Sequence, residues 1–234
     1  MMKKEGESIK GGVDVSVATK IIRRVRSEFR HPTGFSGRVV GWIMALRSSN
    51  RRRNVWSVSL LDVQRRDRVL EIGFGPGIAI KEISRLAVEG YVCGLDHSEE
   101  MLRQATRRNA EAIRMGRVDL RLGSVDSLPV FAKPFDKVLA VNSMMFWSQT
   151  IDRLKELRRL LRPGGRIAIV HQPRGPGATD ATAAARGERI AAALAQAGFR
   201  EVRVQTMNLK PAVVCVIGVN PFEAAVQPAG QCYS

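Results

Sequence analysis

The stretch VLEIGFGPG, residues 69–77, places three glycines at alternate positions directly after an apolar run that also contains Glu71. Where a strand leads into a helix, a glycine-rich loop exposes backbone N–H groups that can bind a polar or anionic ligand. A dinucleotide loop of the type G-x-G-x-x-G would need a glycine where Ile78 stands, and the sequence has no G-x-x-x-x-G-K-[ST] phosphate loop. The residues therefore predict a ligand-binding loop that is neither a dinucleotide loop nor a phosphate loop of these types.

Asp96 ends the next apolar run, YVCGLD, and lies 23 residues after Gly73. This distance takes the chain through one helix and back to the tip of the neighbouring strand. A carboxylate at that tip can accept hydrogen bonds from both hydroxyl groups of a ribose. A ribose is therefore indicated independently of the glycine loop.

Short apolar runs alternate with amphipathic stretches along most of the chain, as strands alternate with helices. The alternation predicts an α/β fold, with a doubly wound, Rossmann-like, seven-stranded and mainly parallel sheet, helices on both faces and an N-terminal helical cap. One continuous helix is expected over residues 98–113. The expected organisation is a flexible N-terminus (1–12), a basic helical cap (13–66), a main domain (67–219) and a flexible tail (220–234).

Five motifs follow one another in the order VLEIGFGPG, GLDHSEEML, LGSVDSLP, FDKVLAVNSMMFW and LRRLLRPGGRIAIV. Together they resemble the class I S-adenosylmethionine-dependent methyltransferases, in the type 11-like branch that includes quinone-biosynthesis and many small-molecule enzymes. The resemblance covers about Arg68 to Val219. It implies methyl transfer as the activity, S-adenosyl-L-methionine as the cofactor, and residues 67–219 as the cofactor-binding methyltransferase domain.

The resemblance also implies cofactor contacts at ten positions, namely Glu71, Gly73, Gly75, Gly77, Asp96, His97, Met101, Ser124, Val125 and Asn142. The three glycines would let the backbone approach the methionine part, where the glutamate orients the loop and the amino group and the asparagine lies nearby. The aspartate would hold the ribose, and His97 and Met101 would flank the adenine. Ser124 and Val125 would meet the adenine edge. Family members often carry an acid where this chain has Ser124, so we expect a weaker adenine contact there.

Candidate substrate-pocket residues lie after the fourth predicted strand, at the end of the fifth and in the cap; they are Trp42, Met145, Phe146, Trp147 and His171. Because a sulfonium methyl group is already activated, the protein mainly has to align the reactants and exclude water. His171 is the candidate base if the acceptor is a hydroxyl or phenol, whereas a thiolate, amine or carbanion needs none. The acceptor atom and the need for a catalytic residue therefore stay open.

The chain has a formal net charge of +16, and its basic residues are concentrated near the N-terminus. Between Lys20 and Arg53, ten basic residues stand against one acid, Glu28. The electric field of such a concentration of positive charge attracts anions, so we expect a small-molecule substrate that is anionic or lipid-like. Two alternatives stay open: an RNA-modifying methyltransferase docked through this segment, and a non-catalytic nucleotide-binding or membrane-surface protein. The motif VNSM, in place of an Asn/Asp-Pro-Pro-aromatic run, disfavours RNA base amino methylation.

Three cysteines, Cys93, Cys215 and Cys232, show no C-x-x-C spacing, which argues against a disulfide framework and against a metal cluster. Cys93 and Cys215 are expected to pack as small core residues. The N-terminus lacks the apolar region of a secretory signal, and no apolar stretch is long enough to span a membrane. We therefore expect a cytoplasmic protein without a transmembrane segment, with peripheral membrane or nucleic-acid contact left to the basic segment.

Overall fold

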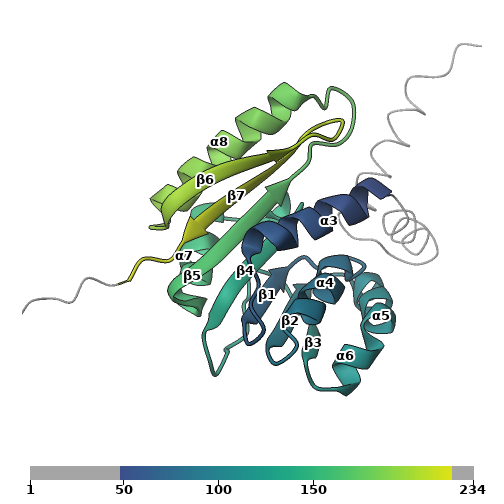
Figure 1. The fold of residues 1–234 in the computed structure, drawn as a ribbon. Helices are drawn as coiled ribbons and strands as arrows, with labels where there is room; N and C mark the ends of the chain where they lie inside the picture. Colours follow the sequence, from purple (N-terminus) through teal and green to yellow (C-terminus); the bar gives the residue numbers. More distant parts are fainter. Residues whose placement is uncertain (1–47, 223–234) are drawn as a thin grey trace, which may run out of the picture.

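A seven-stranded sheet forms the centre of the computed structural model, which describes residues 48–222 (Figure 1). The strand order is β3-β2-β1-β4-β5-β7-β6, and β7 runs antiparallel to its two neighbours while the other strands are parallel. The strands are β1 (Arg68–Ile72), β2 (Tyr91–Asp96), β3 (Val118–Leu122), β4 (Phe135–Val141), β5 (Leu161–His171), β6 (Arg200–Met207) and β7 (Val213–Val219). The predicted Rossmann-like, mainly parallel sheet is confirmed.

Helices cover both faces of this sheet, as predicted (Figure 1). They are α3 (Ser48–Leu61), α4 (Ile78–Leu86), α5 (Glu99–Arg108), α6 (Ala110–Arg114), α7 (Thr150–Leu160) and α8 (Asp180–Gln196), with a short 3-10 helix η1 (Met144–Phe146). Helices α3, α4 and α5 pack on one face, and α7 and α8 on the other. The part of the predicted cap before residue 48, including Trp42, lies outside the described residues.

The sheet has a hydrophobic core on each face because its central strands are apolar at consecutive positions. Val69 and Leu139 point into the core beneath α3, α4 and α5, whereas Leu70 and Val138 point into the core beneath α7 and α8. Continuous apolar runs are typical of parallel strands covered on both faces. The two cores hold the carboxyl ends of β1, β2, β4 and β5 side by side, where the predicted site lies.

The predicted continuous helix over residues 98–113 is wrong, because Asn109 divides it into α5 and α6. The backbone φ of Asn109 is −111°, and its side-chain amide donates to the carbonyls of Gly77 at 3.2 Å and Ala105 at 2.9 Å. Asparagine side chains compete for backbone partners in this way and disfavour helix interiors. At this break, the Asn109 side chain links the end of α5 to Gly77, the last glycine of the loop.

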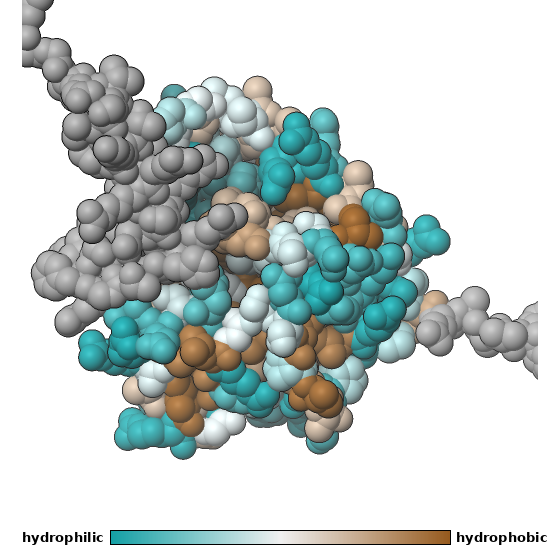
Figure 2. Space-filling model, turned by 180° about the vertical axis from the view of Figure 1, so that it is seen from behind, coloured by the Kyte–Doolittle hydropathy of each residue, from teal (hydrophilic) through white to brown (hydrophobic). Residues whose placement is uncertain are grey.

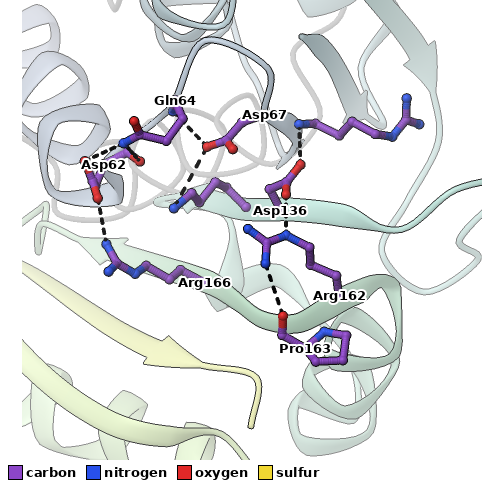
Figure 3. Close-up of polar contacts among 9 residues, drawn as sticks. Asp62, Gln64, Asp67, Asp136, Arg162, Pro163 and Arg166 are labelled. Atoms are coloured by element: carbon purple, nitrogen blue, oxygen red, sulfur yellow. Dashed lines mark hydrogen bonds and ion pairs between the residues drawn. The ribbon is translucent and has the colours of Figure 1, made fainter. Parts of the chain in front are cut away.

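Charged side chains from the α3–β1 connection, β4 and β5 meet where β1, β4 and β5 begin, as Figure 3 shows. This amino-edge network is formed by three ion pairs, Lys137–Asp67, Arg162–Asp136 and Arg166–Asp62. Asp67 also accepts from the backbone N–H of Gln64 at 2.8 Å, and Asp136 accepts from that of Arg68 at 2.7 Å. The network thus fastens the α3–β1 connection to the starts of β4 and β5.

The face opposite to that in Figure 1 carries separate hydrophobic patches between hydrophilic residues (Figure 2). Large apolar side chains exposed on the described part of the molecule include Val130, Met115 and Phe222. Within residues 48–222, no helix has both the length and the apolar character needed to cross a membrane. Asn220, the first residue of the predicted tail, is buried, and its side-chain amide donates to the carbonyl of Leu161 at 2.9 Å.

Candidate functional site at the carboxyl edge of the sheet

The glycine loop lies between β1 and α4 in a backbone conformation that requires glycine. Gly73 has a φ of +75°, and a Cβ atom added there would come within 2.4 Å of the Ser143 Cβ. Gly75 has a φ of +52°, but a Cβ there would meet no atom of residues 48–222 within 4 Å. The first glycine is therefore needed for close packing against the residue after β4, whereas the outer side of Gly75 is open.

Asp96 fixes the loop against the end of β2. Its carboxylate accepts from the backbone N–H of Gly75 at 2.8 Å and from that of Ser98 at 3.0 Å. Burial raises the pKa of Asp96, and the bonds from Ser98 and Gly75 and the nearby His97 counteract this rise. Carboxylate oxygens keep further lone pairs beyond these two bonds, so Asp96 can still accept from a ligand hydroxyl.

Glu71 is a buried carboxyl group in β1 immediately before the loop. Only 1% of the residue is exposed, and the backbone N–H of Ile80 donates to the carboxyl group. Its Oε2 atom has no hydrogen-bond partner in the part of the chain that the structure describes. Burial, and secondarily the charge of Asp96, raise the pKa of Glu71 well above its usual value. An unpartnered oxygen in such a position is costly unless a ligand donates to it.

The residues expected near an adenine lie after β2 and β3 and differ in exposure. His97 lies beside Asp96, with its Nδ1 atom 3.9 Å from an Asp96 oxygen, and its side chain is 36% exposed. Met101 and Val125 are buried in the two cores. The Ser124 hydroxyl already accepts from the backbone N–H of Asp126 at 3.1 Å, so its oxygen is partly occupied by the turn.

The end of β4 lies directly against the glycine loop. The Ser143 hydroxyl donates to the carbonyl of Ile72 at 2.7 Å. Asn142 adopts a positive φ of +54°, and its side-chain oxygen accepts from the backbone N–H of Gln172 at 2.8 Å. The tips of β1, β4 and β5 are thereby joined into one continuous surface.

The aromatic and methionine residues after β4 divide between surface and core. Met145 and Phe146 are 41% and 38% exposed, whereas Trp147 is partly buried against the core beneath α7. Exposed apolar side chains at the carboxyl end of a sheet can line a pocket for an organic ligand. The first two residues therefore present apolar surface beside Asn142, and the tryptophan mainly packs.

His171 ends β5 and is half-buried. Burial, followed by the charges of Arg186 and Arg53, lowers the pKa of His171 to about 4. The imidazole is therefore neutral at physiological pH and can accept a proton, although a group with such a low pKa is a weak base.

Sequence reasoning missed two buried polar residues at this edge, Arg53 and Gln172. Gln172 is 5% exposed and follows His171, and its side-chain oxygen accepts from Arg53 Nη1 at 2.6 Å. The buried positions of α3 have helical spacing but are polar in its first half; they are Asn50, Arg53, Asn54, Ser57, Val58 and Leu61. A polar stripe is typical of a solvent-facing surface, so spacing gave no signal that it is buried.

Neither cysteines nor metal ligands form a second reactive centre in the described range. Cys93 and Cys215 are free and buried in β2 and β7, as expected of small core residues. Within residues 48–222, no three His, Cys, Asp or Glu side chains are grouped as metal ligands. In this range, the candidate site therefore consists of the glycine loop and the residues next to it at the carboxyl edge of the sheet.

Known proteins are similar to this chain in sequence and in fold. The methyltransferase domain family matches residues 69–165. The chain is 34% identical over 184 residues to YdaC, an uncharacterized methyltransferase of Bacillus subtilis (strain 168), across 78% of this chain and 98% of that protein. It is 33% identical to a demethylmenaquinone methyltransferase of Symbiobacterium thermophilum, but across only 43% of this chain and 41% of that enzyme.

Solved methyltransferase structures have the same fold at low identity. The N-methyltransferase NodS of Bradyrhizobium japonicum WM9, in complex with S-adenosyl-L-homocysteine, has a TM-score of 0.60 and 17% identity, covering 77% of this chain and 92% of NodS. A SAM-dependent methyltransferase of Aquifex aeolicus has a TM-score of 0.58 and 19% identity, covering 76% and 96%.

A Rossmann-like sheet in the order 3-2-1-4-5-7-6, with a glycine loop after β1 and an acid at the end of β2, defines a nucleoside-binding α/β protein. The chain belongs to the class I S-adenosylmethionine-dependent methyltransferases. It is a methyltransferase, and S-adenosyl-L-methionine is its cofactor. The open side of Gly75 and the unpartnered Oε2 of Glu71 fit such a ligand.

Proposed function

We propose that the protein transfers a methyl group by in-line displacement to a small-molecule acceptor of anionic or lipid-like character. The observation that carries this proposal is the apolar surface of Met145 and Phe146 at the tip of β4, next to the glycine loop. Similarity to demethylmenaquinone methyltransferases over about half of the chain supports an apolar organic acceptor.

In this proposal the glycine loop and its acidic neighbours bind the cofactor. The backbone at Gly73, Gly75 and Gly77 approaches the methionine part, and Glu71 Oε2 accepts from the cofactor's amino group. Asp96 accepts from the ribose hydroxyls. Each of these groups lies at the carboxyl ends of β1 and β2, where ligands bind in open α/β sheets.

The remaining cofactor contacts are proposed for residues around the adenine and the methionine end. His97 flanks the adenine with its exposed side chain, and Met101 supports that side from the core. Ser124 and Val125 meet the adenine edge, and Asn142 lies near the methionine end. Because the Ser124 oxygen already accepts one bond, adenine recognition rests largely on packing and on the ribose contact.

When bound, S-adenosyl-L-methionine supplies a methyl group activated by a positively charged sulfur. The residues of this chain then have to position the acceptor and exclude water. His171 is the proposed base for a hydroxyl acceptor. Because its pKa is about 4, it can assist an acidic phenol or enol far better than an aliphatic alcohol.

We propose that residues 13–66 form a basic cap over this site and that residues 67–219 form the catalytic domain. The described end of the cap, α3, packs against α4, β4 and β5. Its buried polar stripe lies next to the β5 end, which supports a role beside the substrate.

The proposal is tested by transfer of labelled methyl from S-adenosyl-L-methionine to demethylmenaquinol and to the small-molecule, lipid and RNA fractions of the source organism. We expect label in the small-molecule or lipid fraction. Asp96→Asn should abolish transfer and weaken S-adenosylhomocysteine binding, whereas Asp152→Asn, which removes an exposed carboxylate of α7, should change neither.

Label confined to RNA would replace the proposed acceptor by a nucleic acid docked through the basic segment. Binding of S-adenosylhomocysteine without transfer to any fraction would contradict methyl transfer to a small molecule from that organism. Transfer to demethylmenaquinol alone would narrow the acceptor to a quinol.

A further inference from the structure

Arg53 is a buried guanidinium with no counter-ion among residues 48–222. The residue is 4% exposed, and no carboxylate within residues 48–222 lies within ion-pair distance of it. Its Nη atoms donate to the side-chain oxygens of Gln172 and Asn50, but its Nε atom has no hydrogen-bond partner among the described residues. A buried cation without an anion is strongly unfavourable, so its presence needs a compensating interaction.

The position of Arg53 is fixed by contacts that lead to the candidate site. Gln172, which accepts from Arg53, also donates from its side chain to the carbonyl of Pro211 at 2.9 Å and from its backbone N–H to Asn142 at 2.8 Å. Asn142 precedes Ser143, which packs against Gly73. Arg53 is therefore held at the tips of β4 and β5, one strand away from the glycine loop.

The charges that shift the pKa values of Arg53 and His171 come from arginines. Burial, and then the charge of Arg174, lower the pKa of Arg53 to about 9, and Arg186 and Arg53 contribute to the low pKa of His171. The neighbouring acid at the start of α8, Asp180, accepts from the backbone N–H of Ala212 at 2.7 Å. The described groups thus create a positive potential at the end of β5, which attracts an anion.

We propose that Arg53, positioned by Gln172, binds a carboxylate or another oxyanion of a ligand at the tips of β4 and β5. The planar guanidinium can present its Nε–H together with one Nη–H to two oxygens of such a group. The oxyanion has two sources: the methionine carboxylate of the cofactor, or an acidic group of the acceptor. The second source rests on the proposed function, because it specifies the substrate class of the same site.

The experiment compares wild type, Arg53→Met and the matched control Arg52→Met, which removes an exposed arginine from the same helix. Calorimetry measures the affinity for S-adenosylhomocysteine and for 5′-methylthioadenosine, which lacks the carboxylate. If the cofactor is the source, Arg53→Met should weaken S-adenosylhomocysteine binding roughly tenfold to a hundredfold and leave methylthioadenosine binding unchanged. Arg52→Met should bind both ligands as wild type does.

A second measurement follows the His171 imidazole by NMR titration with inorganic phosphate as the anion probe. It is made on the free protein and with saturating S-adenosylhomocysteine or 5′-methylthioadenosine. An anion on Arg53 offsets positive charge near His171, so its pKa should rise in wild type and not in Arg53→Met. A phosphate effect that persists with S-adenosylhomocysteine bound assigns the subsite to the acceptor. An effect abolished by S-adenosylhomocysteine but not by methylthioadenosine assigns it to the cofactor carboxylate.

Unchanged affinity together with an equal phosphate response in wild type and Arg53→Met would overturn the proposal. If Arg53→Met does not fold, Arg53→Lys keeps the charge but loses the paired donors, and its affinity for the ligand that carries the oxyanion should fall below those of wild type and Arg52→Met. Failure of the wild type to bind S-adenosylhomocysteine would contradict the proposed function, whereas the phosphate response would still test the anion subsite.

Discussion

The two ends of the sheet contain buried ionisable groups that differ in how they are paired. At the amino edge, Asp67 and Lys137 are both 8% exposed in their side chains, and Asp67 is further bonded by the backbone of Gln64. At the carboxyl edge, Glu71 and Arg53 are only 1% and 4% exposed, yet Glu71 Oε2 and Arg53 Nε have no hydrogen-bond partner within residues 48–222. One end therefore pairs its ionisable groups with one another, whereas the other leaves one donor atom and one acceptor atom without a partner in the described range.

This difference separates residues that stabilise the fold from residues that serve binding. Removing one member of a satisfied buried pair leaves the other uncompensated, so the amino-edge network should contribute to stability. Replacing a buried ionisable group that lacks a partner for one of its atoms also removes its desolvation cost, so it costs less stability and can even stabilise the folded state. We therefore expect substitutions at the amino edge to lower the unfolding free energy without changing ligand affinity. Substitutions of the unpartnered groups at the carboxyl edge should lower ligand affinity without lowering the unfolding free energy.

The largest effect is expected for Gly73→Ala, which combines backbone strain with a clash against Ser143. We expect a loss of about 2–5 kcal/mol in unfolding free energy and of cofactor binding. Gly116→Ala is the matched control, because Gly116 has a similar φ of +69° but open space around it. Its cost should be only about 1–2 kcal/mol. Urea unfolding measures both, and equal losses would show that packing against Ser143 is unimportant.

The amino edge should respond to Asp67→Ala by a loss of stability alone. The change leaves Lys137 buried without its carboxylate and the backbone N–H of Gln64 without its acceptor. We expect about 3 kcal/mol lower unfolding free energy and an unchanged Kd for S-adenosylhomocysteine. Calorimetry on the folded variant checks the second part, and a weakened affinity would mean that the two edges are coupled.

The carboxyl edge should respond to Glu71→Gln by a loss of affinity alone. The variant should be as stable as wild type or more stable at neutral pH, while S-adenosylhomocysteine binding falls roughly tenfold. Because the folded-state pKa of Glu71 is raised, the folded protein keeps a proton that the unfolded chain releases above about pH 4.5. Wild-type stability therefore falls as pH rises from there through the folded-state pKa, and the variant should lack this part of the fall. Identical pH profiles would contradict the assignment.

The satisfied and unsatisfied charges also differ in how far the sequence predicts them. Alternating apolar runs set the strands, and the spacing of Gly73 and Asp96 sets the loop and the strand tip, since both depend on local sequence. Arg53 and Gln172 are 119 residues apart, and one lies on a polar helix face that ordinarily faces solvent. Their contact depends on how α3 packs, which local spacing does not specify. Asn109 left a weak signal, because asparagine disfavours helix interiors.

The smallest effect is expected at the exposed rim of the amino-edge network, where Asp62 pairs with Arg166 at 3.1 Å. Asp62 has a φ of +56°, and asparagine also tolerates this conformation, so Asp62→Asn removes the charge without adding backbone strain. The pair is largely exposed, so we expect a loss of about 0–1 kcal/mol that disappears in high salt. Thermal unfolding at low and high ionic strength measures it. A salt-independent loss as large as that of Asp67→Ala would show that the rim, and not the buried pair, holds the amino edge together.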